Sequence, residues 1–124
     1  MDVNFEDEGE QIYRAILPAD CYWKPDGTLS SAAFKDKKGL SVDRANGRSQ
    51  SECISFMKSH LSGSIAFVTV KMCHNVNALL KYLPLPDDEF HSEIHNSESI
   101  ALLSKRQAKY LAHIATVVSR EEGI

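Results

Sequence analysis

The chain has few cysteines, and their spacing excludes several kinds of site. Cys21, Cys53 and Cys73 are far apart, odd in number and form no C-x-x-C pair. A disulfide framework needs an even number of cysteines, and a structural zinc site needs closely spaced ligands. We therefore expect three reduced thiols in a cytoplasmic protein.

Other absences narrow the function further. The chain lacks the G-x-S-x-G motif of a serine hydrolase, and no apolar run is long enough to cross a bilayer. Its start, MDVNFEDEGE, has neither the basic nor the apolar segment of a signal peptide. The formal charge of −3 argues against broad binding to nucleic acid, which needs a surplus of Lys and Arg. We expect no membrane partner and no broad nucleic-acid binding.

The composition is that of one folded domain. The chain has 124 residues, of which 43% are apolar and 25% are charged. This is enough for one hydrophobic core and too little for two. We predict a flexible acidic tail over 1–9, a single domain over 10–119 and a frayed C-terminus over 120–124.

Two segments have the sequence marks of helices. Ser49 with Glu52, and Ser104 with Gln107, have the spacing of a capping box, in which two side chains satisfy free amides of the first helical turn. Apolar residues follow each pair at helical spacing. The pattern predicts two main helices, over 49–62 and 104–118.

The rest of the domain is predicted to be a sheet. Residues rich in β-branched and aromatic side chains, or alternating apolar with polar side chains, are typical of strands. The predicted strands are 11–17, 29–35, 39–44, 64–72 and 89–95, and 74–83 fits either a helix or a strand. We predict an α+β fold: a mostly antiparallel sheet of about five strands with the helices on one side.

A group of cationic residues suggests anion binding. Arg44 and Arg48 flank an Asn-Gly turn just before the first predicted helix, and a helix N-terminus attracts anions. Arginines beside it would add bidentate contacts, although the capping box and Asp43 offer partners within the chain. Arg14 lies inside a predicted strand, where its polar character is unexplained. We predict a ligand site formed by Arg14, Ser41, Arg44 and Arg48.

The segment DDEFHSEIH places histidine and glutamate at alternate positions. In a strand, His91, Glu93 and His95 point to the same side. We predict that His91 is a general base oriented by Glu93. The alternatives are the polar face of a half-exposed strand, or a metal site completed by His74, His60 or Asp87. We assign no metal and no cofactor.

Three short patches resemble a known family. The order of Arg14 in YRA, Ser41 in GLS and Glu93 in HSEIH resembles that of ADP-ribosyltransferase-like domains, including the RES-type toxins. Those domains use an arginine from an early strand, a serine from a later strand and a glutamate further on. The resemblance implies an enzyme that processes a nucleotide.

Our leading prediction is a small binding module that recognises an anionic small molecule, phosphate- or nucleotide-like, or a protein partner. The first alternative is the nucleotide-processing enzyme. The second is a pure interaction protein that docks or oligomerises through a sheet edge or the last helix. An outer apolar patch formed by Tyr110, Ile114 and Val117 would favour this second alternative.

Overall fold

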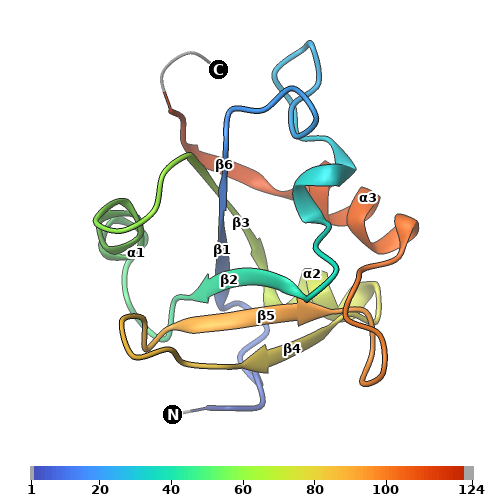
Figure 1. Cartoon of the computed structure of the whole chain (residues 1–124). Coiled ribbons are helices and arrows are strands. Elements are labelled where there is room, and N and C mark those ends of the chain that lie inside the picture. Colours follow the sequence, from blue (N-terminus) through green and yellow to red (C-terminus); the bar gives the residue numbers. More distant parts are fainter. Residues whose placement is uncertain (1, 122–124) are drawn as a thin grey trace.

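The computed structural model describes residues 2–121 as one six-stranded antiparallel sheet with helices packed on it (Figure 1). The strands are β1 (Gln11–Ile16), β2 (Leu40–Arg44), β3 (Ser64–Thr69), β4 (Leu79–Tyr82), β5 (His91–His95) and β6 (Thr116–Ser119). The helices are α1 (Gln50–Lys58), α2 (Val70–Asn75), α3 (Lys105–Ile114) and the 3₁₀ helix η1 (Ser31–Phe34). The strand order is β4-β5-β2-β1-β3-β6, which confirms the predicted α+β fold.

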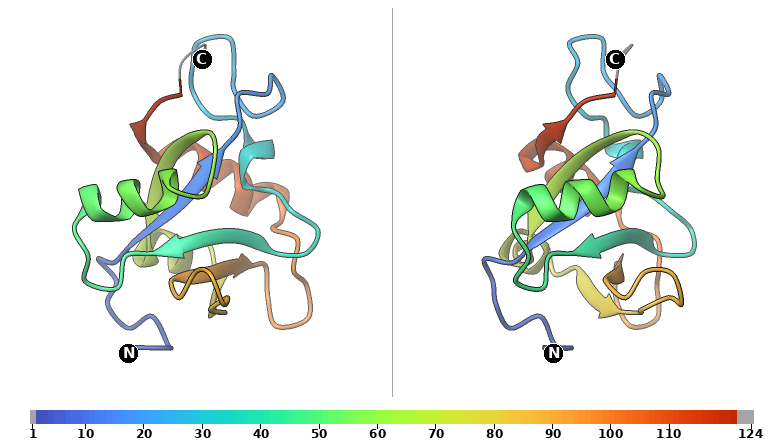
Figure 2. Two further views of the ribbon diagram at one scale, coloured as in Figure 1. Left: turned by 60° about the vertical axis from the view of Figure 1, so that its left-hand side comes forward. Right: turned by 90° about the vertical axis from the view of Figure 1, so that its left-hand side faces the viewer.

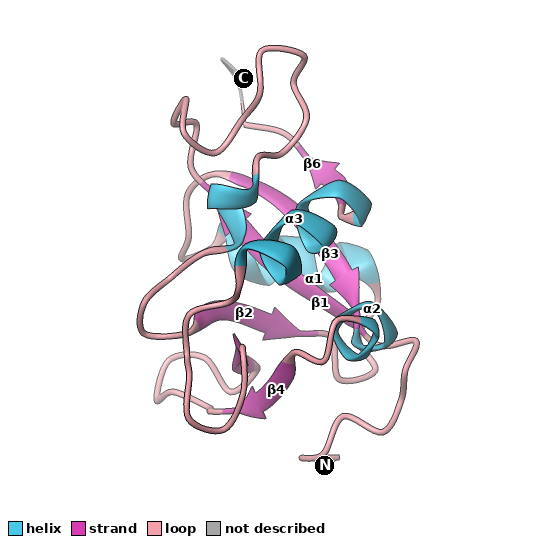
Figure 3. Ribbon diagram, turned by 90° about the vertical axis from the view of Figure 1, so that its right-hand side faces the viewer, coloured by secondary structure: helices cyan, strands magenta, loops and turns pink. Residues whose placement is uncertain are grey.

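The two faces of the sheet carry two separate cores. Along β1, Ile12 and Ile16 pack in the larger core with α3, while Tyr13 packs with Cys53 and Met57 of α1. This alternation follows from the two-residue period of a strand. The helices therefore lie on opposite faces, as Figures 2 and 3 show for α1 and α3, and the prediction that they share one side is wrong.

Both predicted capping boxes are present, although both helices are shorter than predicted: the one predicted over 49–62 ends at Lys58. Ser49 accepts the amide of Glu52, and Ser104 accepts the amide of Gln107. The segment 104–118 contains a helix only to Ile114, and β6 follows it and pairs with β3. β-branched residues dominate β6, which favours an extended backbone and explains the early end of the helix.

Two predicted strands are also corrected. Residues 31–34 form the 3₁₀ helix η1, in which Ala33 and Phe34 are buried, and not part of a strand. The strand predicted over 64–72 ends at Thr69, because the Thr69 side chain accepts the amide of Met72 and starts α2. The ambiguous segment 74–83 contains the last turn of α2 and then β4.

The first residues of the chain contribute to the core, although they were predicted to form a tail. Phe5 is only 1% exposed, and the guanidinium of Arg44 lies 4.0 Å from the centre of its ring. Arg44 also donates to both carboxylate oxygens of Glu10, at 2.8 and 2.7 Å, and to the carbonyl oxygen of Asp2. The prediction that residues 1–9 bury little is therefore wrong at Phe5.

The end of the described chain also makes contacts. Arg120 donates to the carbonyl oxygen of Gly27 at 3.3 Å, and the amide of Glu121 donates to Ser64 Oγ at 2.9 Å. The remainder of the predicted frayed terminus, 122–124, lies outside the described residues. Within residues 2–121, no helix has the length and apolar character needed to cross a membrane.

Glu10→Gln is expected to lower the free energy of unfolding by about 3–5 kcal/mol, because it leaves the buried charge of Arg44 without a counter-charge. Urea unfolding followed by circular dichroism measures the change. Glu8→Gln is the matched control. Glu8 is exposed, and its ion pair with His74 Nδ1 is long, at 3.7 Å, so its loss should cost little. A loss of less than about 1 kcal/mol for Glu10→Gln would show that the ion pair is not an anchor of the fold.

Candidate functional site

A pocket of about 400 Å³ opens on the face of the sheet that α1 covers. This volume is within the range of small-molecule sites. Its apolar lining comes from Met57, Leu61 and Leu85, beside backbone and side chains of β1 and β2. The lining residues that have titratable or hydroxyl side chains are Tyr13, Arg14, Ser41, Asp43, His60, Asp87, Asp88 and His91.

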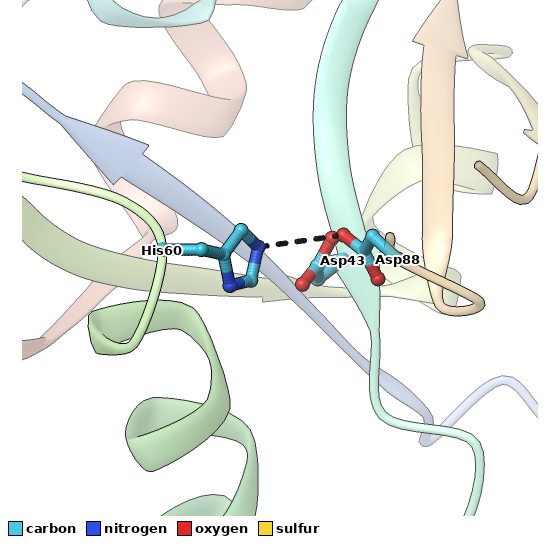
Figure 4. Close-up of side chains that lie close together, drawn as sticks. All are labelled: Asp43, His60 and Asp88. Atoms are coloured by element: carbon cyan, nitrogen blue, oxygen red, sulfur yellow. Dashed lines mark ion pairs between the residues drawn. The ribbon is translucent and has the colours of Figure 1, made fainter. Parts of the chain in front are cut away.

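Three of these side chains form a compact group, which we call the Asp-His-Asp cluster: Asp43, His60 and Asp88. One carboxylate oxygen of each aspartate and one ring nitrogen of the histidine all lie within 4.8 Å of one another. Figure 4 shows the imidazole directed at the two carboxylates, with His60 Nε2 at 3.8 Å from Asp88 Oδ2. The cluster joins a strand, the end of a helix and a loop that are distant in sequence.

Each member of the cluster is positioned by its own element. Asp43 lies in β2, opposite Tyr13 of β1 and His91 of β5, which directs its side chain toward α1. The turn before β5 positions Asp88, whose Oδ1 accepts the amide of Phe90 at 2.9 Å. His60 follows the end of α1, and its Nδ1 lies 2.9 Å from the carbonyl oxygen of Phe56.

The electrostatics of the cluster are unfavourable for two ionised carboxylates. Asp43 is only 3% exposed, and its Oδ2 has no hydrogen-bond partner among the described residues. Burial, together with the neighbouring Asp88, raises the pKa of Asp43 to about 8, although Arg48 acts in the opposite direction. A proton or a cation between the two carboxylates would relieve their repulsion.

A second polar pair lies on the same pocket. His91 Nδ1 is 2.8 Å from the carbonyl oxygen of Leu83, and His91 Nε2 is 3.4 Å from Ser41 Oγ. Because a carbonyl only accepts, Nδ1 carries the proton and Nε2 is free to accept one from Ser41. The arrangement is that of a hydroxyl beside an oriented base, at a distance that is long for a hydrogen bond.

The structure brings three of the six predicted site residues to this pocket: Arg14, Ser41 and His91. The guanidinium of Arg14 is held by the carbonyl oxygens of Ala33 and Ser41, each at 3.0 Å. Burial lowers its pKa from the ordinary value. Arg14 therefore contributes to the wall of the pocket with its donors directed at backbone.

The other three predicted residues make contacts elsewhere. Arg44 is bound to Glu10. Arg48 donates to the carbonyl oxygens of Ala45 and Arg44, and it lies 3.4 Å from the centre of the Phe90 ring. Glu93 shares a face of the sheet with Ser41, but its Oε1 is 2.7 Å from His95 Nε2. None of the three lines this pocket.

The sequence did not predict that Asp43, His60 and Asp88 lie together. Asp43 was expected to be a partner for arginine, and His60 an extra ligand for a metal at His91. Positions 43, 60 and 88 follow no motif spacing, and each is a common residue type in an ordinary polar segment. The one available signal was the acidic side chain of Asp43 inside a predicted strand.

Comparison with known proteins gives no family for this chain. No protein-family model matches it. The searches of curated proteins and of solved structures also found no match. The geometry of the pocket is therefore the basis for a functional proposal.

Asp43→Asn is expected to stabilise the protein in a chelating buffer near neutral pH, by about 1–3 kcal/mol, because the folded wild type keeps Asp43 protonated where the unfolded chain ionises it, whereas asparagine is neutral in both states. The pKa of Asp43 is about 8 when folded and 3.8 ordinarily, so the wild type loses stability as the pH rises between these values. The advantage of the variant should therefore be larger at about pH 8 than at about pH 5. Urea unfolding at both pH values measures it, with Asp87→Asn as the control, and equal advantages at both would contradict this expectation.

Proposed function

We propose that this domain binds a small phosphate- or nucleotide-like molecule in the pocket between β1, β2 and α1. The observation that supports the proposal is convergence: Arg14, Ser41 and His91 come from three different strands and line one pocket. A scattered arrangement would have left no common site for them.

The lining of the pocket suits a ligand that has both a ring and polar groups. Met57, Leu61 and Leu85 offer apolar surface to a base or another ring. The hydroxyl of Ser41 donates to an acceptor oxygen, and Nε2 of His91 accepts from a donor or, when protonated, donates to a phosphate. Such a mixture of apolar surface and few polar groups is typical of small-molecule sites.

The acidic lining sets a condition on an anionic ligand. Asp43, Asp87 and Asp88 line the same pocket. Arg44 is paired with Glu10 and Arg48 donates to backbone carbonyl oxygens, so of these two only Arg48 offsets the acidic charge there, and only in part. A phosphate group in this pocket would therefore need a cation beside it.

A nucleotide-processing enzyme is the second candidate, and the contact of Ser41 with His91 favours it. In that mechanism His91 accepts the proton of Ser41 or of a bound water, and its Nδ1 contact with Leu83 keeps the ring oriented. The ADP-ribosyltransferase-like version also needs Glu93, which is directed at His95. An active form would require Glu93 to turn toward Ser41, its neighbour across the strand pair.

The remaining predictions concern partners and location. Tyr110, Ile114 and Val117 are partly buried and packed against the larger core, so they do not form the outer patch that would favour an interaction protein. A protein partner, oligomerisation through α3 or a sheet edge, and a cytoplasmic location stay predictions.

The proposal is tested by titrating ¹⁵N-labelled protein with AMP and with inorganic phosphate, first without a divalent cation, then with Mg²⁺ and then with Zn²⁺. Amide shifts are expected to concentrate in β2, β5 and the loop between β4 and β5. His91→Ala should weaken AMP binding about tenfold, which corresponds to the loss of roughly one hydrogen bond.

The matched control is His113→Ala, because His113 lies on α3 and lines a different surface. It should leave the affinity for AMP unchanged. The proposal is overturned if the amide shifts are confined to another surface, or if neither probe binds. It is also overturned if His91→Ala and His113→Ala lose affinity for AMP equally.

A further inference from the structure

The Asp-His-Asp cluster brings one oxygen of each carboxylate and one imidazole nitrogen within 4.8 Å of one another. Asp43 Oδ2 is buried and has no partner among the described residues. Asp88 uses Oδ1 to accept the amide of Phe90, which leaves Oδ2 facing His60 at 3.8 Å. Two ionised carboxylates this close repel each other unless a proton or a cation lies between them.

The orientation of His60 makes its free nitrogen a third acceptor. Nδ1 is 2.9 Å from the carbonyl oxygen of Phe56, so this nitrogen carries the proton and Nε2 of the neutral ring has a lone pair. A histidine that binds a metal typically donates its other N–H to a backbone carbonyl or a carboxylate. The ring also packs edge-on against Phe56, with 4.7 Å between ring centres, which restrains its orientation.

We propose that Asp43, His60 and Asp88 bind one divalent transition-metal ion at the wall of the pocket. The unpartnered oxygen of Asp43 is the observation that distinguishes this group from an ordinary acidic surface cluster, because its side chain is almost fully buried and lines the pocket. The cation would supply the positive charge that neither Arg44 nor Arg48 supplies directly.

The donor set indicates the class of metal. An imidazole nitrogen favours Mn²⁺, Fe²⁺ or Zn²⁺ over Mg²⁺ and Ca²⁺, which prefer oxygen ligands alone. Three protein ligands also leave a coordination position for water or a ligand atom, as in catalytic metal sites.

The cluster must contract slightly to bind such an ion. Ligand atoms around a tetrahedral ion lie roughly 3.3 Å apart, whereas those of the cluster lie within 4.8 Å of one another. His60 can make this adjustment, because its side chain is 29% exposed and follows the end of α1.

The metal also explains how an acidic pocket can accept a phosphate. A divalent ion held by carboxylates commonly completes its coordination with phosphate oxygens of the ligand. This second role rests on the proposed function, whereas the metal site itself does not.

The test is a calorimetric titration of the full chain with Mn²⁺, without phosphate or nucleotide, and the stoichiometry is checked by native mass spectrometry. Mn²⁺ is the probe because the exposed thiol of Cys21 has less affinity for it than for Zn²⁺. The wild type is expected to bind one ion per chain. Asp43→Asn and His60→Gln should each weaken binding at least tenfold.

The matched control is Asp87→Asn, which removes one negative charge from the same pocket without touching the cluster. It should change the affinity by less than about threefold, the size of a screened charge effect. Circular dichroism shows whether each variant is folded, and Asp43→Asn is expected to be more stable than the wild type in chelator.

The proposal is overturned if the wild type fails to bind Mn²⁺ at millimolar concentration. It is also overturned if Asp43→Asn and His60→Gln retain binding, or if Asp87→Asn weakens it equally. In those cases a shared proton, or diffuse attraction of cations, accounts for the cluster. Because no phosphate is present, binding of Mn²⁺ without binding of AMP would refute the proposed ligand and leave the metal site standing.

Discussion

The buried ion pair between Arg44 and Glu10 is the constraint on which the rest of the structure depends. It anchors the end of β2 on one face of the sheet, where Arg44 also covers Phe5. Since successive side chains of a strand point to opposite faces, this anchor directs the preceding residue, Asp43, to the other face. A shift of β2 by one residue would bring Arg44 into the pocket and bury Asp43 in the wrong core.

The same strand pairing determines which polar groups meet. β2 lies between β1 and β5, so Asp43 is flanked by Tyr13 and His91, and Ser41 is close to His91. The loop before β5 and the end of α1 then add Asp88 and His60. The antiparallel sheet thus holds the side chains of Tyr13, Ser41, Asp43 and His91 beside two groups from outside the strands, which is a common way to build a binding site.

Some elements were predictable because their signals are local. The capping boxes at Ser49 and Ser104 depend on side chains three residues apart, and both are present. The end of α3 was not predictable in this way, because the helical spacing of apolar residues continues past Ile114. The β-branched Thr116 and Val117 favour a strand there, and their pairing with β3 decides between the two. The partner of Arg44 was not predictable for the same reason. Arg44 pairs with Glu10, which is 34 residues away, and no local pattern around either residue indicates this contact.

By itself, the sequence determined the class of fold, the starts of the two main helices and a list of polar residues with chemical potential. These features follow from patterns within a few residues, because the spacing of apolar side chains differs between a helix and a strand. Only the tertiary structure decided which residues on that list meet. It joined Ser41 to His91 and Asp43 to His60 and Asp88, and it placed Arg44, Arg48 and Glu93 elsewhere. The reason is that strand register and loop closure, and not spacing along the chain, determine the distances between these side chains.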